Sequence, residues 1–352
     1  MLLQLLPTNA PESTPSIQRG SFHGAGGTLL GMQIVNVCLT IVTLGAYHFW
    51  AKAKIRRYLF SQTSFAGDRF VYHGTGKELY QGFLKAMVVF GIPYFSLGAA
   101  QSFLTLPQPV DVLLQAMAAL VLFLYVPVAI VNARRYRCTR TSWRGIRFSF
   151  RGRTVDFLKL YFKGWLFTLL TLGTYYPYFQ TQRQAFLHSH TYFGNQRFQF
   201  TGHGSGLMVP FAVTLFTTYA VLCLCGLALA LQLTNAGLTL LLIPFVLGPV
   251  WVWLLGQKQK YYWDHTTFGE ARFSSSITWQ KLFGLYLGNL ALLLLTLGWA
   301  WPWVTVRNAR FFIGTLSLQG LTDLDRVLQD TTETSVTGEG LSNLLDTGFD
   351  MD

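Results

Sequence analysis

The sequence predicts an all-α polytopic membrane protein with about seven transmembrane helices, internal repeats in inverted orientation, and short interfacial elements resembling β-hairpins. Three observations predict this fold class: a low content of charged residues, recurring apolar stretches, and two motifs that repeat along the chain. Of the 352 residues 51% are apolar and only 12% are charged, and the mean hydropathy is +0.35. Soluble domains carry about 25% charged residues, so the composition favours a membrane protein.

Seven apolar stretches are long enough to cross a hydrocarbon core of about 30 Å, which takes about 20 helical residues. They comprise residues 28–48, 82–104, 112–131, 157–178, 207–231, 236–256 and 281–303. Backbone groups in hydrocarbon must satisfy one another's hydrogen bonds, because no water is available there. We therefore expect each stretch to form a helix.

Two motifs repeat along the chain. The phrase TLG begins the segments TLGAYHFWAKAKIRRY, TLGTYYPYFQTQRQAF and TLGWAWPWVTVRNARF, which start at Thr43, Thr171 and Thr296. The second motif, Thr-x-aromatic-x-x-x-Arg-Phe, starts at Thr63, Thr141, Thr191 and Thr266. Three of its copies continue as alternating aromatic residues that end in glycine, a pattern that indicates a short strand followed by a turn.

The repeats predict five parts of the chain. These are a flexible tail (1–20), repeat A with three spans (21–147), repeat B with three spans (148–272), half-repeat C with one span (273–320), and an acidic, disordered tail (321–352). A repeat with an odd number of spans places its successor upside down in the membrane. The connections 49–81 and 132–156 would then lie on one side, and 179–206 and 257–280 on the other.

The distribution of basic residues favours this inverted arrangement. Windows 50–76 and 132–156 hold thirteen Lys and Arg residues, whereas the matched windows 178–204 and 257–281 hold six. The positive-inside rule then predicts a periplasmic N-terminus and a cytoplasmic C-terminus. The alternative is that each TLG segment is a re-entrant hairpin, so that all motifs share one side. Pro177, Pro302 and the TLG glycines favour a break there, and irregular backbone is tolerated where protein surrounds it.

Arginines are the main candidate site residues. The motif arginines are Arg69, Arg147, Arg197 and Arg272. Their donor forks fit a lipid phosphate or an anionic substrate, although a structural role in capping helix carbonyls explains four copies more simply. The stretch 132–153 holds eight arginines and no acid, and from it we select Arg134, Arg135 and Arg137 as contacts to anionic headgroups. Each basic residue near such a surface contributes about 1 kcal/mol.

Two asparagines fall deep in equivalent spans. Asn36 and Asn289 either hold helices together or line a polar pathway through the membrane. The histidines at 188, 190, 203 and 265 lack a Cys or carboxylate at ligand spacing, so we predict no metal site. Nothing in the sequence matches a phosphate-binding loop, a nucleophile elbow or a zinc-protease helix. We therefore expect no enzymatic activity, catalytic residue or cofactor.

The net charge of +12 conceals two opposite parts. Residues 321–352 carry a net charge of −7, and the rest of the chain carries +19. Because the basic residues flank apolar spans and no nucleic-acid motif accompanies them, we expect anionic lipid headgroups as partners and no nucleic acid. The sequence does not identify a protein partner.

The segments TLGAYHFWAKAKIRRY and FAGDRFVYHGTGKEL, with their later copies, resemble the YjgN-like family of bacterial inner-membrane proteins. The resemblance covers about residues 20–315 and implies the bacterial inner membrane as the location. The family is defined by a domain of unknown function, so the resemblance assigns no role to any residue.

Two functions are compatible with these observations. Inverted repeats often build secondary transporters with a site at the repeat interface, which suggests a small-molecule permease or exporter with Asn36 and Asn289 near a polar cavity. This hypothesis depends on an architectural analogy. The alternative is a non-transporting membrane scaffold or anionic-lipid-interacting protein that uses its arginine-rich face.

Overall fold

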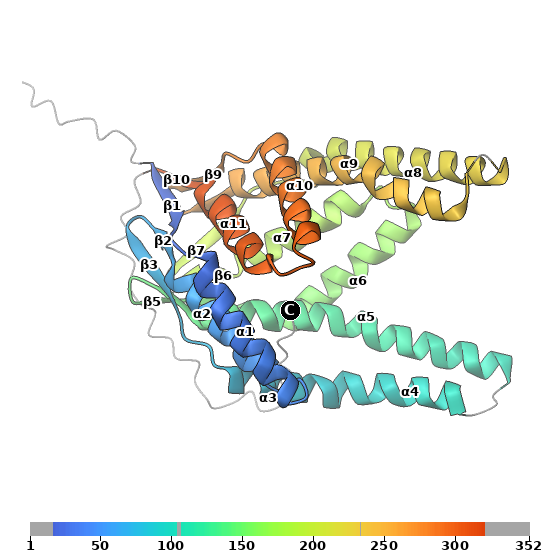
Figure 1. Cartoon of the computed structure of the whole chain (residues 1–352), viewed down its shortest axis with the longest axis horizontal. Coiled ribbons are helices and arrows are strands. Elements are labelled where there is room, and N and C mark those ends of the chain that lie inside the picture. Colours follow the sequence, from blue (N-terminus) through green and yellow to red (C-terminus); the bar gives the residue numbers. More distant parts are fainter. Residues whose placement is uncertain (1–16, 104–106, 233, 321–352) are drawn as a thin grey trace, which may run out of the picture.

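The computed structural model describes residues 17–103, 107–232 and 234–320. Ten short strands form a closed barrel at one end of the molecule, and the helices extend away from it (Figure 1). Neighbouring strands are antiparallel and follow the order β1-β10-β9-β8-β7-β6-β5-β4-β3-β2, with β2 pairing with β1 to close the ring. The barrel therefore brings together residues from both ends of the described chain.

The barrel consists of four β-hairpins and a fifth strand pair. The four hairpins are the copies of the Thr-x-aromatic-x-x-x-Arg-Phe motif: β2 (Thr63–Phe65) with β3 (Asp68–Tyr72), β4 (Thr141–Trp143) with β5 (Ile146–Phe150), β6 (Thr191–Phe193) with β7 (Gln196–Phe200), and β8 (Thr266–Phe268) with β9 (Ala271–Ser275). The fifth pair joins the two ends of the described chain, β10 (Leu316–Gln319) and β1 (Gln18–Phe22). Each motif is thus one hairpin.

Aromatic side chains fill the inside of the barrel. Trp143, Phe193 and Phe268 are buried there, and Phe70 and Phe148 pack against them. Equivalent phenylalanines of successive hairpins lie two strands apart, yet their ring centroids are only 6.2–6.4 Å apart. On a flat sheet, where strands are about 4.8 Å apart, such positions would be nearly 10 Å apart. The rings therefore converge on the barrel axis, and the alternating residues face outward.

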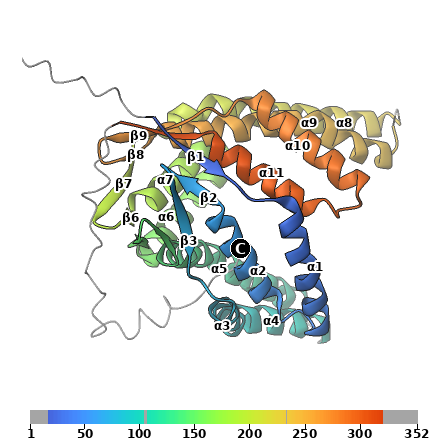
Figure 2. The ribbon, with the colours of Figure 1, turned by 60° about the vertical axis from the view of Figure 1, so that its left-hand side comes forward.

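Helical hairpins connect successive β-hairpins and are of two lengths. The three short ones are α1 (Gly26–Val42) with α2 (His48–Ser61), α6 (Thr154–Leu170) with α7 (Tyr176–Ser189), and α10 (Trp279–Leu295) with α11 (Trp301–Gly314). Figure 2 shows α1 with α2, and α10 with α11, leaving the barrel and returning to it. Neighbouring hairpins pack side by side around the ring, which closes where α1 contacts α11.

The two long hairpins lie between the short ones. The first rises through α3 (Gly76–Ala86), the π-helical turn η1 (Met87–Gly91) and α4 (Ile92–Phe103) and returns through α5 (Gln108–Thr139). The second consists of the 3-10 turn η2 (Gly204–Leu207), α8 (Met208–Ala230) and α9 (Ala236–Asp264). Among the described residues, the four rods of these hairpins are the helices that are long and apolar enough to cross a membrane.

Each TLG phrase reverses the chain at the tip of a short hairpin. Leu172 and Gly173 have φ angles of 49° and 91°, values that glycine adopts readily and leucine rarely. The Gly173 N–H donates to the carbonyl of Thr168 at 2.7 Å, and the Thr171 hydroxyl accepts from the Tyr175 N–H at 3.0 Å. The other two tips have the same φ pattern, at Leu44 with Gly45 and at Leu297 with Gly298. The phrase therefore encodes a helical C-cap and an immediate return.

The predicted all-α fold with about seven spans is wrong. The expected spans 28–48, 157–178 and 281–303 are each a 17-residue helix followed by the TLG turn and the start of a returning helix. The apolar residues of the turn extended each stretch to the length of a span. The β elements are not isolated interfacial hairpins either, because they form one barrel.

The predicted inversion of the repeats fails for a related reason. Strands from residues 63–72, 141–150, 191–200 and 266–275 are hydrogen-bonded to one another in a single ring, so they occupy one side of any membrane. Gln18 pairs with Leu318, so the two ends of the described chain also share a side. The reversal at each TLG phrase is the feature that the re-entrant alternative requires.

Candidate anion-binding surfaces

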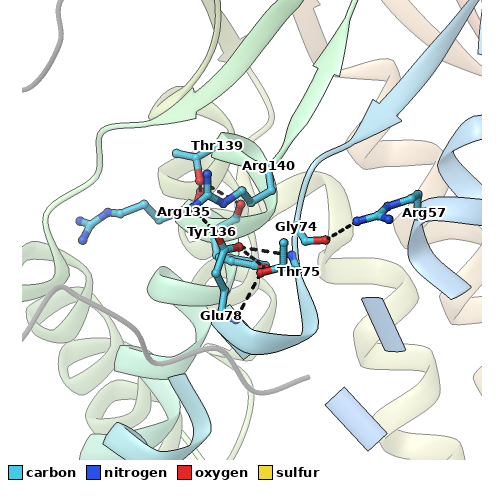
Figure 3. Close-up of polar contacts among 8 residues, drawn as sticks. All are labelled: Arg57, Gly74, Thr75, Glu78, Arg135, Tyr136, Thr139 and Arg140. Atoms are coloured by element: carbon cyan, nitrogen blue, oxygen red, sulfur yellow. Dashed lines mark hydrogen bonds and ion pairs between the residues drawn. The ribbon is translucent and has the colours of Figure 1, made fainter. Parts of the chain in front are cut away.

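The junction between helices and barrel is rich in basic side chains. We define it as the C-terminal turns of α2, α5, α7, α9 and α11 together with the segments that follow β1, β3, β5, β7 and β9. Arginines at equivalent positions of three returning helices donate to the glycine carbonyl that follows a neighbouring β-hairpin. These pairs are Arg57 to Gly74 (3.4 Å, Figure 3), Arg135 to Gly152 (3.0 Å) and Arg310 to Gly24 (3.5 Å).

Tyrosines of α2 and α9 link the end of each returning helix to the start of its helical hairpin. The Tyr58 hydroxyl accepts from the N–H of Ala25 at 2.8 Å and donates to its carbonyl. Tyr261 binds the backbone of His203 in the same way, at 2.8 and 2.7 Å. Both tyrosines lie eleven positions before a motif arginine, and each fixes the start of its own helical hairpin.

Glu78 is an acidic side chain within this basic junction. It forms a capping box with Thr75 at the start of α3, accepts from the Tyr136 hydroxyl at 3.1 Å, and pairs with Arg140 at 2.8 Å (Figure 3). The Glu78 and Arg140 side chains are about one-third exposed, so the ion pair contributes at most about 1 kcal/mol. Its main effect is to hold α5 against the start of α3.

The other arginines selected from the sequence lie on the last turns of α5. The Arg134 guanidinium donates to the Thr191 hydroxyl at 3.4 Å, and Arg137 donates through Nε to the Ala133 carbonyl at 3.2 Å. Arg137 is exposed, whereas Arg134 and Arg135 are half-buried. The arginine-rich stretch is therefore partly a structural clamp and partly an exposed basic surface.

The motif arginines occupy a second surface. All four are exposed and lie on the outer wall of the barrel, next to the β-turns and at the end away from the helices. Each sits opposite a residue with a hydroxyl group: Arg69 opposite Ser64, Arg147 opposite Ser142, Arg197 opposite Tyr192, and Arg272 opposite Thr267. Arg197 also donates to the Ser189 carbonyl.

Sequence reasoning missed a fifth member of this set. Arg19 is exposed on β1 and pairs with Ser317 of β10, as Arg69 pairs with Ser64. The signal was present in QRGSFHG, which aligns with DRFVYHG, but the partner strand is about 300 residues away in the sequence. We call Arg19, Arg69, Arg147, Arg197 and Arg272 the rim arginines.

The two asparagines selected as pathway residues lie at separate helix contacts. The Asn289 amide donates to the Asn308 side-chain oxygen of α11 at 2.7 Å. Asn36 is buried on α1, which packs against α11 and α2, and its amide makes no hydrogen bond to other described residues. In the remaining short hairpin, α6 with α7, the equivalent residue is Gly164, which contacts the Phe179 ring. All three positions lie where the helices approach closely.

The four histidines do not converge. His190 and His265 each bond to a backbone carbonyl of their own helix, and His203 bonds to the Thr201 carbonyl. Within the ranges that the structure describes, no three His, Cys, Asp or Glu side chains gather as metal ligands would.

His188 is buried at the end of α7 against β8. Its Nε2 accepts from the Gln184 amide at 2.6 Å, and its Nδ1 lies 3.2 Å from the Thr266 hydroxyl, which donates to the Tyr262 carbonyl. These partners suit a neutral imidazole protonated on Nδ1. Burial, and secondly the nearby Arg134, lower the pKa of His188 to about 4.

The far end of the molecule lacks basic residues. The connections at the far ends of the five helical hairpins contain no Lys or Arg; they comprise residues 43–47, 104–107, 171–175, 231–235 and 296–300. The junction and the barrel carry the arginine clamps and the rim arginines. The four windows whose Lys and Arg residues were counted in the sequence therefore lie on the same side of the molecule. Their different counts are differences between copies of the junction, not between two sides of a membrane.

The chain has relatives among bacterial membrane proteins. The profile of a family described as "Bacterial protein of unknown function (DUF898)" matches residues 17–344. Proteins named "Inner membrane protein YjgN" from Escherichia coli O157:H7, Escherichia coli K12 and Salmonella typhimurium are 35%, 33% and 32% identical over 129, 129 and 130 residues. Each match covers 37% of this chain, which spans about 30% of the length of these relatives. No solved structure matches the chain significantly.

Proposed function

We propose that this chain, which belongs to the DUF898 family, is a non-enzymatic, non-transporting membrane protein that binds anionic lipid headgroups at the junction between its helices and its barrel. In this proposal the two long hairpins cross the inner membrane and the barrel lies in the cytoplasm. The observation that carries it is the segregation of all basic clusters to the barrel end of four apolar rods.

The orientation follows from the positive-inside rule. Cytoplasmic connections of bacterial membrane proteins are enriched in Lys and Arg, and here the far connections contain neither. Because the ends of β1 and β10 pair in the barrel, both ends of the described chain are then cytoplasmic. The earlier expectation of a periplasmic N-terminus is replaced by this arrangement.

The apolar parts of the long helices end just before the junction. In α5 the apolar run ends at Val131, and arginines follow from Arg134; in α9 the run ends at Leu255, and lysines follow from Lys258. These positions are equivalent in the two hairpins. Basic side chains at the end of a span lie at the level of the lipid phosphates, where anionic lipids attract them. The rim arginines lie farther along the barrel, beside the β-turns, and Arg197 reaches back to the Ser189 carbonyl at the end of α7.

The short hairpins have the surface of lipid-facing segments. Their tip leucines are almost fully exposed: 97% for Leu44, 83% for Leu172 and 91% for Leu297. Exposed leucines at the tip of a helical hairpin that is anchored beside membrane spans favour insertion into the nearer leaflet. Since the short helices are only about half as long as the long rods, the short hairpins would not reach the other leaflet.

The test compares two sets of three substitutions in the full chain, reconstituted into nanodiscs of neutral lipid with added phosphatidylglycerol. The first set, Arg137→Gln, Arg153→Gln and Lys260→Gln, removes exposed charges at the junction. The matched control, Arg19→Gln, Arg69→Gln and Arg272→Gln, removes the same charge from the rim. Phosphatidylglycerol should raise the thermal midpoint of the unsubstituted chain, because a ligand of the folded state stabilises it.

The junction variant should lose most of this stabilisation, since each basic residue contributes about 1 kcal/mol, or roughly fivefold in affinity. The rim variant should retain it. Equal losses in the two variants would show a general charge effect and would reject a lipid site at the junction.

The permease hypothesis has lost its main support. It depended on inverted repeats, and the barrel excludes them. It also required Asn36 and Asn289 near a shared polar cavity, whereas they lie at contacts of different hairpins. Substrate uptake by vesicles that contain the purified chain would restore a transport function.

A further inference from the structure

The numbers of helices differ between the two halves of the helical region. Near the barrel ten helical rods lie side by side, because all five hairpins begin and end there. Only the two long hairpins continue, so four rods reach the far end. Figure 1 shows the short hairpins stopping well before the tips of α4, α5, α8 and α9. These counts refer to the helices of the described ranges.

The short hairpins present apolar surface outward along their length and not only at their tips. Val35 and Val37 of α1, Phe162 and Leu166 of α6, and Leu287 and Leu290 of α10 are all exposed. A soluble surface rarely exposes such contiguous apolar patches. Lipid acyl chains beside the long rods are the environment that would cover them.

We propose that the chain is a membrane wedge, which prefers lipid surfaces that are convex toward the barrel. The inference depends on the proposed insertion of the short hairpins into the barrel-side leaflet. The six additional rods, each about 10 Å in diameter, occupy roughly 500 Å² in that leaflet and nothing in the other. A flat bilayer must compress the crowded leaflet to accommodate this difference. Bending the bilayer so that its barrel side becomes convex relieves the compression.

Sorting between vesicles of different size tests the wedge. The full chain is labelled with a fluorophore and reconstituted with the barrel outside, in a mixture of small and large vesicles of neutral lipid. The density of protein per unit area should be about twofold higher on the small vesicles, which corresponds to a bias of only about 0.4 kcal/mol. Equal densities, or enrichment on the large vesicles, would overturn the inference.

Variants at the hairpin tips separate the wedge from a general effect of charge. The variant Leu44→Lys, Leu172→Lys and Leu297→Lys opposes burial of all three tips, because a lysine deep in hydrocarbon costs several kcal/mol. It should lose the preference for small vesicles. Its control places three lysines on the exposed residues Val71, Gln199 and Ser276 of the barrel side, and should keep the preference. Preference retained in the tip variant would reject the wedge even if the chain is inserted.

A measurement of depth distinguishes failure of the wedge from failure of the insertion. A spin label at Leu44→Cys, in a chain whose exposed cysteines are replaced, reports its depth through collisions with oxygen and with a polar relaxation agent. A label in the hydrocarbon together with equal densities on all vesicles rejects the wedge alone. A label at headgroup depth or in water rejects the insertion on which both proposals depend. A correctly folded tip variant retains the thermal unfolding transition of the barrel.

Discussion

The short and long helical hairpins make the same kind of connection but differ in length and in the structure of their tips. Both join successive β-hairpins, and in both classes a returning helix carries an arginine clamp to neighbouring backbone, as α2, α5 and α11 show. The long hairpins run on until they can cross a membrane, whereas the short ones stop at a TLG phrase. Apolar length alone does not distinguish them. The tip of the short hairpins distinguishes them, because a residue with positive φ followed by glycine ends the helix there and reverses the chain.

The largest expected effect concerns pH and the end of a short hairpin. His188 is 8% exposed, and its pKa of about 4 lies below the ordinary value of 6.5. Between these two pH values, His188 therefore binds a proton in the unfolded chain but not in the folded chain. Stability is complete above about pH 6.5 and falls as the pH decreases to about 4, by about 3 kcal/mol in total. Chemical denaturation of the reconstituted chain between pH 7 and pH 4 measures this loss.

The variant His188→Gln should flatten that dependence. The equivalent residues of the long hairpins, Cys138 and Trp263, are neutral throughout this range, so pH sensitivity is expected only at the short hairpin. An unchanged slope in the variant would assign the dependence to other groups.

The next effect concerns the close approach of two short helices. A side chain at Gly164 would meet the Phe179 ring of α7, whereas Gly226 of the long hairpin has open space around its α-carbon. Gly164→Val should therefore lower the free energy of unfolding by roughly 1–3 kcal/mol. Gly226→Val should change it little, since lipid-facing space accepts the side chain. Thermal unfolding of both variants makes the comparison, and equal losses would mean that the short hairpins are not more closely packed.

The smallest effect concerns the tip itself. Gly173 has a φ of 91°, so Gly173→Ala should cost about 1 kcal/mol because alanine avoids this conformation. In the long hairpin, Gly226 lies within α8 at helical φ, and Gly226→Ala should instead stabilise by about 0.5–1 kcal/mol. Opposite signs in denaturant titrations would support the difference between the tips. A stabilising Gly173→Ala would contradict the TLG turn.

Local structure was largely predictable from the sequence, whereas the arrangement of the elements was not. Alternating aromatics in three motif copies predicted strands near residues 70–72, 148–150 and 198–200, and β3, β5 and β7 form there. Closure of the barrel depends on β10 and β1, whose sequences LSLQ and QRGSF lack that alternation. Pairings between distant segments leave no local pattern. The fifth strand pair was therefore missed, and a common side of all motifs was predicted only as the alternative.

The candidate residues were predictable to a similar degree. The motif arginines share one environment, as their repetition suggested, but on a single rim and with Arg19 as an additional member. Arg135 holds a backbone carbonyl, a role that its charge did not indicate. Composition predicted the basic surface. Only the paired strands revealed which basic residues face the helices and which lie beyond them.

The most direct test of this account is the topology of the β-hairpins in intact cells. Single cysteines are placed at Gln62, His190 and Thr267, beside three different hairpins, and at Gln232 at the far end of α8, in a chain without its native cysteines. We predict that an impermeant thiol reagent applied outside the inner membrane labels Gln232→Cys and none of the other three. Labelling at His190→Cys and Thr267→Cys, with Gln62→Cys protected, would contradict the single barrel and restore the inverted repeats.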